Sequence, residues 1–226
     1  EKLGADTFRF WSASEINHGY DFRCNEQKIE STKKFLSKLW NVSRFLSSFP
    51  VIESGKPSAS DEWILSELDK LVKECKKGYE EYNFFIPAIA IREFTWNVFA
   101  AHYIEMVKTR AYGIGFSDEE RDGAIFTLHK TLSTILKLLA PITPFITEHL
   151  WKELYSKDSI HKEKHVEPEN IEEQNNITKE ISEFNSKVWN EKKSQNLSLK
   201  DSIKIEIPKS LEPFKKDLKS MHNLSD

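Results

Sequence analysis

Residues 25–49 read NEQKIESTKKFLSKLWNVSRFLSSF and contain neither glycine nor proline. Apolar side chains recur along this stretch at helical spacing, at Ile29, Leu36, Leu39, Val42, Leu46 and Phe49. This period is typical of a helix with one buried face, and Asn25 is a favourable N-cap residue. The stretch therefore predicts an amphipathic helix of about seven turns.

The flanking sequence repeats this helical pattern. Further helices are expected at residues 5–14, 58–82, 87–110, 117–140, 144–155, from about 177, and at 211–221. Ile203, Ile205 and Ile207 instead alternate with charged residues, which is the period of a strand, and a lone strand would need a partner outside this chain. The sequence predicts a mainly α fold, a helical bundle with a small C-terminal α/β appendage.

The composition argues against two classes of protein. Of the 226 residues, 38% are hydrophobic and 31% are charged, which is too apolar for a disordered chain and too charged for a membrane protein. No run approaches the roughly 20 apolar residues of a spanning helix, and the first residues do not resemble a secretion signal. We expect a cytoplasmic chain with no membrane partner. Because it does not begin with methionine, we also expect a fragment of a longer protein.

Common catalytic motifs are missing from the sequence. It has no glycine-rich phosphate loop, no Gly-x-Ser-x-Gly and no His-Glu-x-x-His, the motifs that most directly indicate an enzyme. His161 and His165 offer a weak metal site, but charged linkers contain such pairs routinely. We expect no catalytic residue, no cofactor and no metal in this chain.

One face of the predicted helix at residues 25–49 combines cations, an amide and aromatic rings. These residues are Lys34, Lys38, Trp40, Asn41, Arg44 and Phe45. Unstacked RNA bases are held by such a combination: rings for stacking, polar groups for base edges and cations for phosphates. The alternative is that this helix lies at the centre of the bundle and that Phe45 contacts another helix.

A second stripe follows the helix expected at residues 87–110. On a helical wheel its members are Arg92, Trp96, Phe99, Tyr103 and Arg110. We expect Trp96 and Phe99 in the core, and Arg92, Tyr103 and Arg110 to reach outward toward nucleic acid. Lysines 187, 192 and 193 are further candidates for phosphate contact, although single lysines are most often only solvated.

Five ordered blocks of this sequence resemble one protein family. They are GADTFRFWSAS (4–14), GYDFR (19–23), FLSKLWNVSRF (35–45), YIEMVKTR (103–110) and LAPITPFITE (139–148). Together they resemble the C-terminal anticodon-binding region of class I aminoacyl-tRNA synthetases, most closely that of valyl-tRNA synthetases. The chain departs from the family at Ser37, where many relatives have asparagine, and at residues 161–168, where the usual hydrophobic stretch is replaced by charged residues.

The resemblance implies three parts and a function. Residues 1–24 would be a junction that follows an absent catalytic core, residues 25–160 the anticodon-binding bundle, and residues 161–226 a linker with a partial C-terminal α/β subdomain. The chain would recognise the anticodon stem and loop of a valine tRNA. Its other partners would be the catalytic and editing domains of the same polypeptide. The parent would be a valine–tRNA ligase that uses ATP and Mg²⁺, whereas this chain, which lacks the HIGH and KMSKS motifs, would be inactive alone.

With the resemblance added, roles can be assigned to the residues of the first face. Trp40 or Phe45 would stack on bases, Asn41 and Arg44 would bond base edges, and Lys34 and Lys38 would contact phosphates. Two alternatives are the same region of an isoleucyl- or leucyl-tRNA synthetase and a helical protein-interaction module, which salt would hardly affect. A third, a metal-dependent enzyme that uses His161 and His165, would carry stoichiometric zinc.

Overall fold

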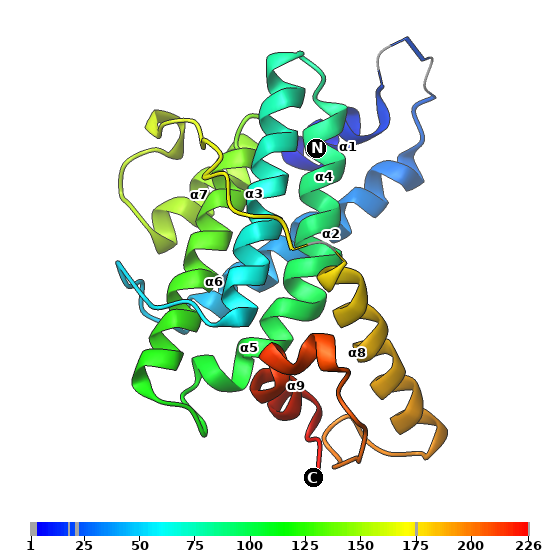
Figure 1. The fold of residues 1–226 in the computed structure, drawn as a ribbon. Coiled ribbons are helices and arrows are strands. Elements are labelled where there is room, and N and C mark those ends of the chain that lie inside the picture. The colour runs from blue at the N-terminus through cyan, green and yellow to red at the C-terminus, as the bar shows by residue number, and fades with distance from the viewer. Residues whose placement is uncertain (1–3, 18, 21–22, 175, 226) are drawn as a thin grey trace. The chain divides into compact units, whose positions relative to one another are not determined.

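The computed structural model describes residues 4–17, 19–20, 23–174 and 176–225. Helices form nearly all of its regular structure (Figure 1). They are α1 (Ala5–Glu15), α2 (Glu26–Leu46), α3 (Ala59–Glu80), α4 (Phe85–Glu93), η1 (Phe94–Tyr103), α5 (Ile104–Ala111), α6 (Asp118–Leu139), α7 (Pro144–Leu154), η2 (Ile160–Lys162), α8 (Ile177–Ser194), η3 (Lys209–Phe214) and α9 (Lys215–His222). The expected mainly α class is confirmed. Asp21 and Phe22, from one of the five family-like blocks, lie outside the described residues.

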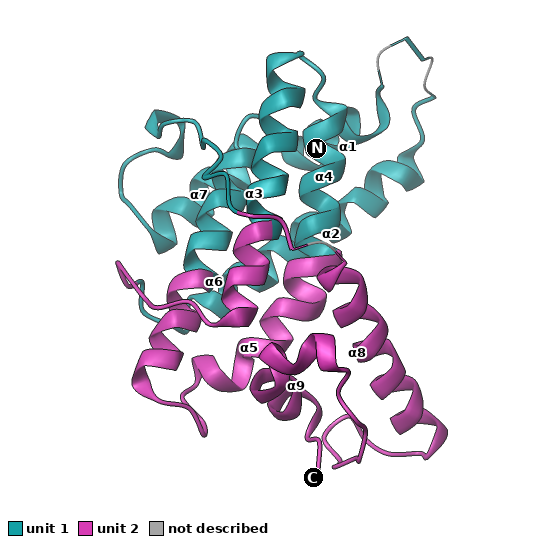
Figure 2. Ribbon diagram, in the orientation of Figure 1, with its two compact units in different colours: residues 1–51, 67–96, 128–171 teal, residues 52–66, 97–127, 172–226 magenta. Residues whose placement is uncertain are grey.

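The contacts divide the chain into two compact units (Figure 2). Unit 1 comprises residues 1–51, 67–96 and 128–171, and unit 2 comprises residues 52–66, 97–127 and 172–226. The three parts expected from the family resemblance are continuous segments of the chain, whereas each compact unit combines several segments. The three-part division stays a prediction. No helix in the described residues is long and apolar enough to cross a membrane.

In unit 1, α1 packs against α2, α4 and α7. Phe10 of α1 stacks on Phe35 of α2, with ring centroids 4.6 Å apart. The carboxylate of Asp6 accepts a hydrogen bond of 2.6 Å from the backbone N–H of Ile146, and so occupies the N-terminal end of α7, where unpaired N–H groups and the helix dipole favour an anion. These contacts fix α2 and α7 in the same unit.

In unit 2, α5 packs against α9, and η3 packs against both α8 and α9. The indole N–H of Trp63, which is fully buried, donates a 2.8 Å hydrogen bond to the hydroxyl of Thr178 at the start of α8. Aromatic side chains that carry a polar group usually find such a partner when buried.

The local signals for helix starts are confirmed. The Asn25 side chain accepts hydrogen bonds from the backbone N–H groups of Gln27 and Lys28, as an N-cap does. Ser117 and Glu120 bond reciprocally at the start of α6, since the Glu120 carboxylate accepts from the Ser117 N–H at 2.8 Å and the Ser117 hydroxyl accepts from the Glu120 N–H at 3.3 Å. This is the capping box that their spacing predicts.

Two expected elements differ from the structure. The helix expected at residues 87–110 contains a π-helical stretch, η1, between α4 and α5. The strand expected at residues 203–207 is wrong, because Ile203 forms only an isolated parallel bridge, and its partner is Leu224 of the same chain. Among the described residues no strand is present.

Candidate nucleic-acid interface

The apolar arc of α2 decides which of its side chains face solvent. Leu39 and Leu46 are fully buried, and the polar residues on the other side of the helix remain accessible. Of the residues predicted to bind nucleic acid, Lys34, Asn41, Arg44 and Trp40 are exposed, the last by 42%. The predicted face of α2 therefore exists as a surface, and the alternative of a central, enclosed helix does not hold for these four residues.

A first cluster joins α2 to the helix that follows α4. The ammonium group of Lys38 lies 5.9 Å from the ring centroid of Trp96, within the range of a cation–π interaction. Trp96 is 38% exposed, so its expected core position is wrong. Arg92 is half-buried one turn before Trp96. Its Nε atom lies 3.6 Å from the carboxylate oxygen Oε1 of Glu93. Lys34 and Asn41 lie about one turn from Lys38 on α2, and Arg92 lies one turn from Trp96 at the end of α4. We use the name α2–α4 ledge for the Lys38–Trp96 pair together with these three neighbours in the chain.

A second cluster lies between α2 and α7. The indole of Trp40 stacks on the imidazole of His149, with centroids 5.4 Å apart and planes within 5°. Beside this pair is a cavity of about 390 Å³, the α2–α7 pocket, lined by Trp40, Ser43, Arg44, Ser47, His149, Leu150, Glu153 and Leu154. All of these residues belong to unit 1.

Phe45 has an intermediate position. Its side chain is half-buried and meets Phe49 edge to face, with centroids 5.3 Å apart and an interplanar angle of 78°. The ring is therefore partly packed, and only part of it remains for stacking.

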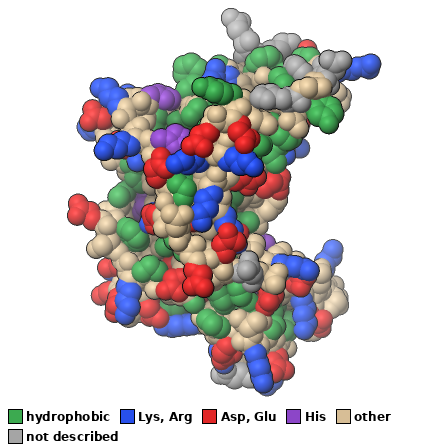
Figure 3. Space-filling model, turned by 45° about the horizontal axis from the view of Figure 1, so that its top comes forward, with side chains coloured by type: hydrophobic (Ala, Val, Ile, Leu, Met, Phe, Trp, Pro, Cys, Tyr) green, Lys and Arg blue, Asp and Glu red, His purple; other side chains and the backbone are tan. Residues whose placement is uncertain are grey.

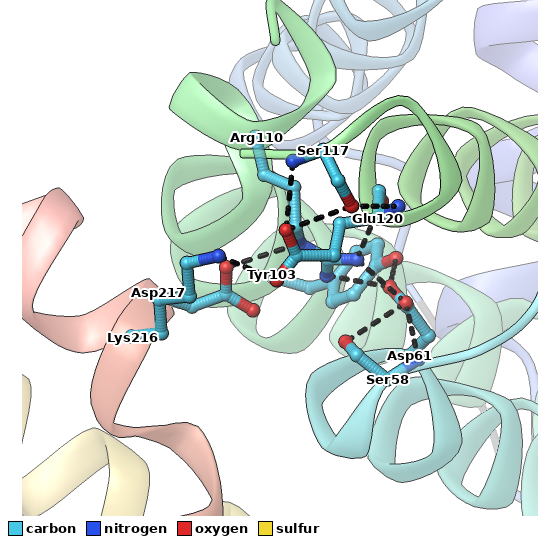
Figure 4. A network of polar contacts seen from close by, with 8 residues as sticks. All are labelled: Ser58, Asp61, Tyr103, Arg110, Ser117, Glu120, Lys216 and Asp217. Carbon is cyan, nitrogen blue, oxygen red and sulfur yellow. Dashed lines mark hydrogen bonds and ion pairs between the residues drawn. The ribbon is translucent and has the colours of Figure 1, made fainter. Parts of the chain in front are cut away.

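Tyr103 and Arg110, expected to reach outward, are buried, and this expectation is wrong. Their exposed fractions are 0% and 1%. Figure 4 shows Arg110 between Asp61 at the start of α3 and Asp217 of α9. The guanidinium donates two hydrogen bonds of 2.8 Å to the carboxylate of Asp61 and one of 3.0 Å to Asp217. The phenol of Tyr103 donates to Asp61 at 2.5 Å.

This buried network has a structural logic of its own. Asp61 also accepts bonds from the N–H and hydroxyl of Ser58, so one carboxylate caps α3 and neutralises a buried arginine. Burial disfavours the charge of Arg110, but the hydrogen bond and charge of Asp61 outweigh it and raise the arginine pKa above its ordinary value. Burial also raises the pKa of Asp217, although Arg110 lies beside it. A buried charge needs such partners. Because the polar atoms of Tyr103 and Arg110 are buried and bonded within this network, they are not available to bind RNA.

The remaining candidates separate in the same way. Phe99 is fully buried, as expected. Lys187 and Lys193 of α8 are exposed, but Lys192 is 1% exposed and donates 2.7 Å hydrogen bonds to the backbone carbonyls of Leu199 and His222. Its expected availability for phosphate is therefore wrong.

The two histidines of the weak metal motif do not lie on a common α-helix. His161 lies in η2 and His165 in irregular backbone, and both are exposed. The Nδ1 atom of His165 lies 3.0 Å from the carbonyl oxygen of Val166. Within the described residues, no group of three or more His, Cys, Asp or Glu side chains is placed to hold a metal ion.

Sequence reasoning missed His149 as a member of the candidate site. The block LAPITPFITE stops one residue before it, and only its place on the polar side of α7 distinguished it. Its contact with Trp40 joins positions more than a hundred residues apart in the chain, which no local pattern reveals. On the face drawn in Figure 3, lysines and arginines are interspersed with aspartates and glutamates.

Comparisons with known proteins match the whole chain to one group. The family model described as the anticodon-binding domain of tRNA ligase matches residues 61–207. The valine–tRNA ligase of Pyrobaculum aerophilum is 40% identical over 100% of this chain, and that of Nanoarchaeum equitans is 37% identical over 99%. In both cases the chain spans 29% of the relative's length.

One solved structure shares the fold. The LeuRS AgnB2 of Agrobacterium radiobacter K84, crystallised in a ternary complex with tRNA and LeuAMS, superposes with a TM-score of 0.56 over 74% of this chain and 20% of that one. The sequences are 18% identical, so this likeness concerns the fold alone.

Proposed function

The chain belongs to the anticodon-binding domain family of tRNA ligases, and from this membership we propose that it binds the anticodon stem and loop of a valine tRNA. In the whole protein, this binding would place the tRNA for aminoacylation by a catalytic core outside residues 1–226. The core would supply the ATP and Mg²⁺ sites, and the enzyme would work in the cytoplasm.

The observation that carries the proposal is likeness to valine–tRNA ligases along the entire chain. Three relatives of this kind are 36–40% identical over 98–100% of it, so the likeness includes α2 as well as the region that the family model matches. The surface of α2 is consistent with the role. It presents a ring at Trp40, an amide at Asn41 and cations at Lys34 and Arg44 to solvent.

These groups suit single-stranded RNA better than a duplex. Loop bases can be splayed out, stacked on aromatic rings and bonded at their edges, whereas duplex grooves require an element that inserts into them. Held on a rigid helix, the contacts would fix the tRNA precisely enough to affect distant chemistry, because misplacing a substrate by about 1 Å can cost on the order of a hundredfold in rate.

The test is direct binding of labelled stem-loops. The anticodon stem-loop of a valine tRNA should bind more tightly than those of isoleucine and leucine tRNAs, and affinity should fall steeply as salt rises from 50 to 200 mM, since each neutralised phosphate releases counterions. Equal affinity for all three would overturn the valine assignment. Failure to bind any of them at low salt would overturn RNA recognition and favour a protein-interaction module.

A further inference from the structure

Two polar side chains of α1 hold the corner of the chain between α6 and α7. We infer that Asp6 and Arg9 are positioning residues for the RNA-binding face of α2. Acting through α7, they hold His149 against Trp40 and so fix the orientation of a ring that meets the RNA. This inference rests on the proposed function and adds residues that do not touch the RNA themselves. All four residues belong to unit 1.

The N-terminus of α7 receives its cap from α1. Thr143 occupies the N-cap position but makes no capping hydrogen bond, and among the described residues its buried hydroxyl has no hydrogen-bond partner. The carboxylate of Asp6 takes this role, because it accepts from the backbone N–H of Ile146 at 2.6 Å and from that of Phe145 at 3.4 Å. These are the N–H groups that a helix start leaves unpaired. The side chain that caps α7 therefore comes from 140 residues earlier in the chain.

Arg9 holds the same corner by its carbonyl groups. The Nε atom donates a 2.9 Å hydrogen bond to the carbonyl oxygen of Ile142, and Nη2 donates one of 3.0 Å to that of Pro141. Two bonds from one planar guanidinium fix direction as well as distance. Asp6 and Arg9 lie about one turn apart on α1, so they bind the donors that begin α7 and the acceptors just before it. Movement of α7 along or about its axis would break one of these sets.

The same helix is also fixed to α2. Phe10 of α1 stacks on Phe35 of α2, and the carboxylate of Glu15 lies 2.9 Å from the ammonium group of Lys28 in the first turn of α2. α2 and α7 contact each other, and α1 contacts both. The position of α7 relative to α2 therefore depends on contacts made by α1.

The consequence for RNA binding arises at Trp40. His149 lies about one turn beyond Ile146 on α7, and its imidazole stacks on the indole of Trp40 with planes within 5°. The indole remains 42% exposed, so it is supported by α7 and still accessible. A base stacks best on a ring that is already held, because ordering a mobile side chain costs free energy on binding. Loss of the α1 contacts would loosen α7 and release this support.

The first experiment needs no RNA and compares Asp6→Ala and Arg9→Ala with Glu15→Gln. The control removes a polar contact of α1 that joins it to α2 and not to α7. The chain has six tryptophans, and Trp40→Phe identifies the NMR signal of the Trp40 indole N–H. We expect this signal to shift in Asp6→Ala and Arg9→Ala and to stay in place in Glu15→Gln. An unmoved signal in the first two variants would overturn the inference.

The second experiment measures binding of the labelled valine stem-loop at a temperature where thermal melting shows each variant folded. Asp6→Ala and Arg9→Ala should weaken binding about fivefold, and Glu15→Gln should leave it unchanged. Asp6→Asn keeps an acceptor oxygen for the N–H groups of α7 and should recover most of the affinity. Arg9 is exposed, so Arg9→Ala preserves the test if Asp6→Ala does not fold. Variants that melt earlier but bind like wild type would reduce both residues to a structural role.

A double-mutant cycle with Trp40→Ala tests the route. Positioning through the indole predicts that Asp6→Ala weakens binding little further once Trp40 is gone, whereas independent sites would give additive losses. Additive losses would overturn the route through Trp40. Failure of the wild-type chain to bind any stem-loop would overturn the proposed function and this role with it. Wild-type binding that Asp6→Ala and Arg9→Ala leave unchanged would overturn this inference alone.

Discussion

Two arginines, Arg44 of α2 and Arg110 of α5, lie in opposite environments. Arg44 is next to Phe45 in the sequence, and Arg110 belongs to the aromatic stripe of residues 92–110. Both arginines were therefore candidates for RNA contact. Arg44 is exposed beside the α2–α7 pocket, whereas Arg110 is buried in unit 2 with Asp61 and Asp217. Residue type alone therefore does not decide the role of an arginine. What separates the two arginines is that the fold buries Arg110 and pairs it with carboxylates, whereas Arg44 is exposed.

The largest effect is expected from breaking the buried network. Arg110→Met leaves the carboxylates of Asp61 and Asp217 buried without their cation, and should lower the free energy of unfolding by about 3–5 kcal/mol. Urea denaturation measures it. Arg44→Met is the control and should change stability by no more than about 0.5 kcal/mol. Similar losses in the two variants would refute the contrast.

A pH effect is expected from another buried group of unit 2. Burial, together with the nearby charges of Lys192 and His102, lowers the pKa of His222 to about 4, and its Nε2 lies 2.7 Å from the side-chain oxygen of Asn185. Between pH 6.5 and 4, the side chain of His222 binds a proton in the unfolded chain but stays neutral in the folded chain. The free energy of unfolding should therefore fall as pH falls from 6.5 to 4. The loss attributable to His222 is about 3 kcal/mol at most.

The measurement is urea denaturation of wild type and His222→Gln across that pH range. The variant should lose less stability on acidification than wild type does. Parallel pH profiles for the two proteins would show that His222 does not titrate differently on folding.

For the exposed arginine the expected effect is on binding. Arg44→Met should weaken binding of the valine stem-loop by about 1–3 kcal/mol if it bonds a base or a phosphate, with no loss of stability. Fluorescence anisotropy of a labelled stem-loop measures this. An unchanged affinity would show that Arg44 does not contact the RNA. The two arginines would then differ in burial but not in RNA binding.

The smallest effect is expected at Lys34, an exposed lysine on the α2–α4 ledge. If it neutralises one phosphate, Lys34→Ala should reduce the salt dependence of log affinity by about one unit of slope. Lys187→Ala, an exposed lysine of unit 2, is the comparison. Equal reductions in both variants would indicate a diffuse field of charge in place of a local contact.

Local signals predicted the helices well because they act within a few residues. Asn25 and the Ser117–Glu120 box mark true helix starts, and the apolar period of α2 identifies its buried side. The strand at residues 203–207 failed for the opposite reason. Alternating residues form a strand only where a neighbouring strand supplies a series of backbone hydrogen bonds, and Ile203 forms a single bridge with Leu224.

The candidate site was predicted in part. The exposed face of α2 followed from one helix and its period. Phe99, Tyr103 and Arg110 share one side of the helix, as the wheel of about 100° per residue predicts, and that side is buried. The errors at Tyr103 and Arg110 therefore arise because their polar groups were expected to reach outward. Trp96 departs from the buried side within η1, where π-helical winding turns less per residue. The carboxylates that bury Arg110 come from residues 61 and 217, and no pattern within one segment indicates such distant partners.

The π-helical stretch Phe94–Tyr103 also bears on how homologous chains should be compared. A helix that widens can absorb an additional residue without a loop, so a change in chain length need not disturb the ends of the element. A relative in which this stretch winds as an ordinary α-helix would keep its counterpart of Arg110 in register by having fewer residues here. A short alignment gap inside residues 94–103 would then record a change of pitch and not the loss of the arginine's carboxylate partners.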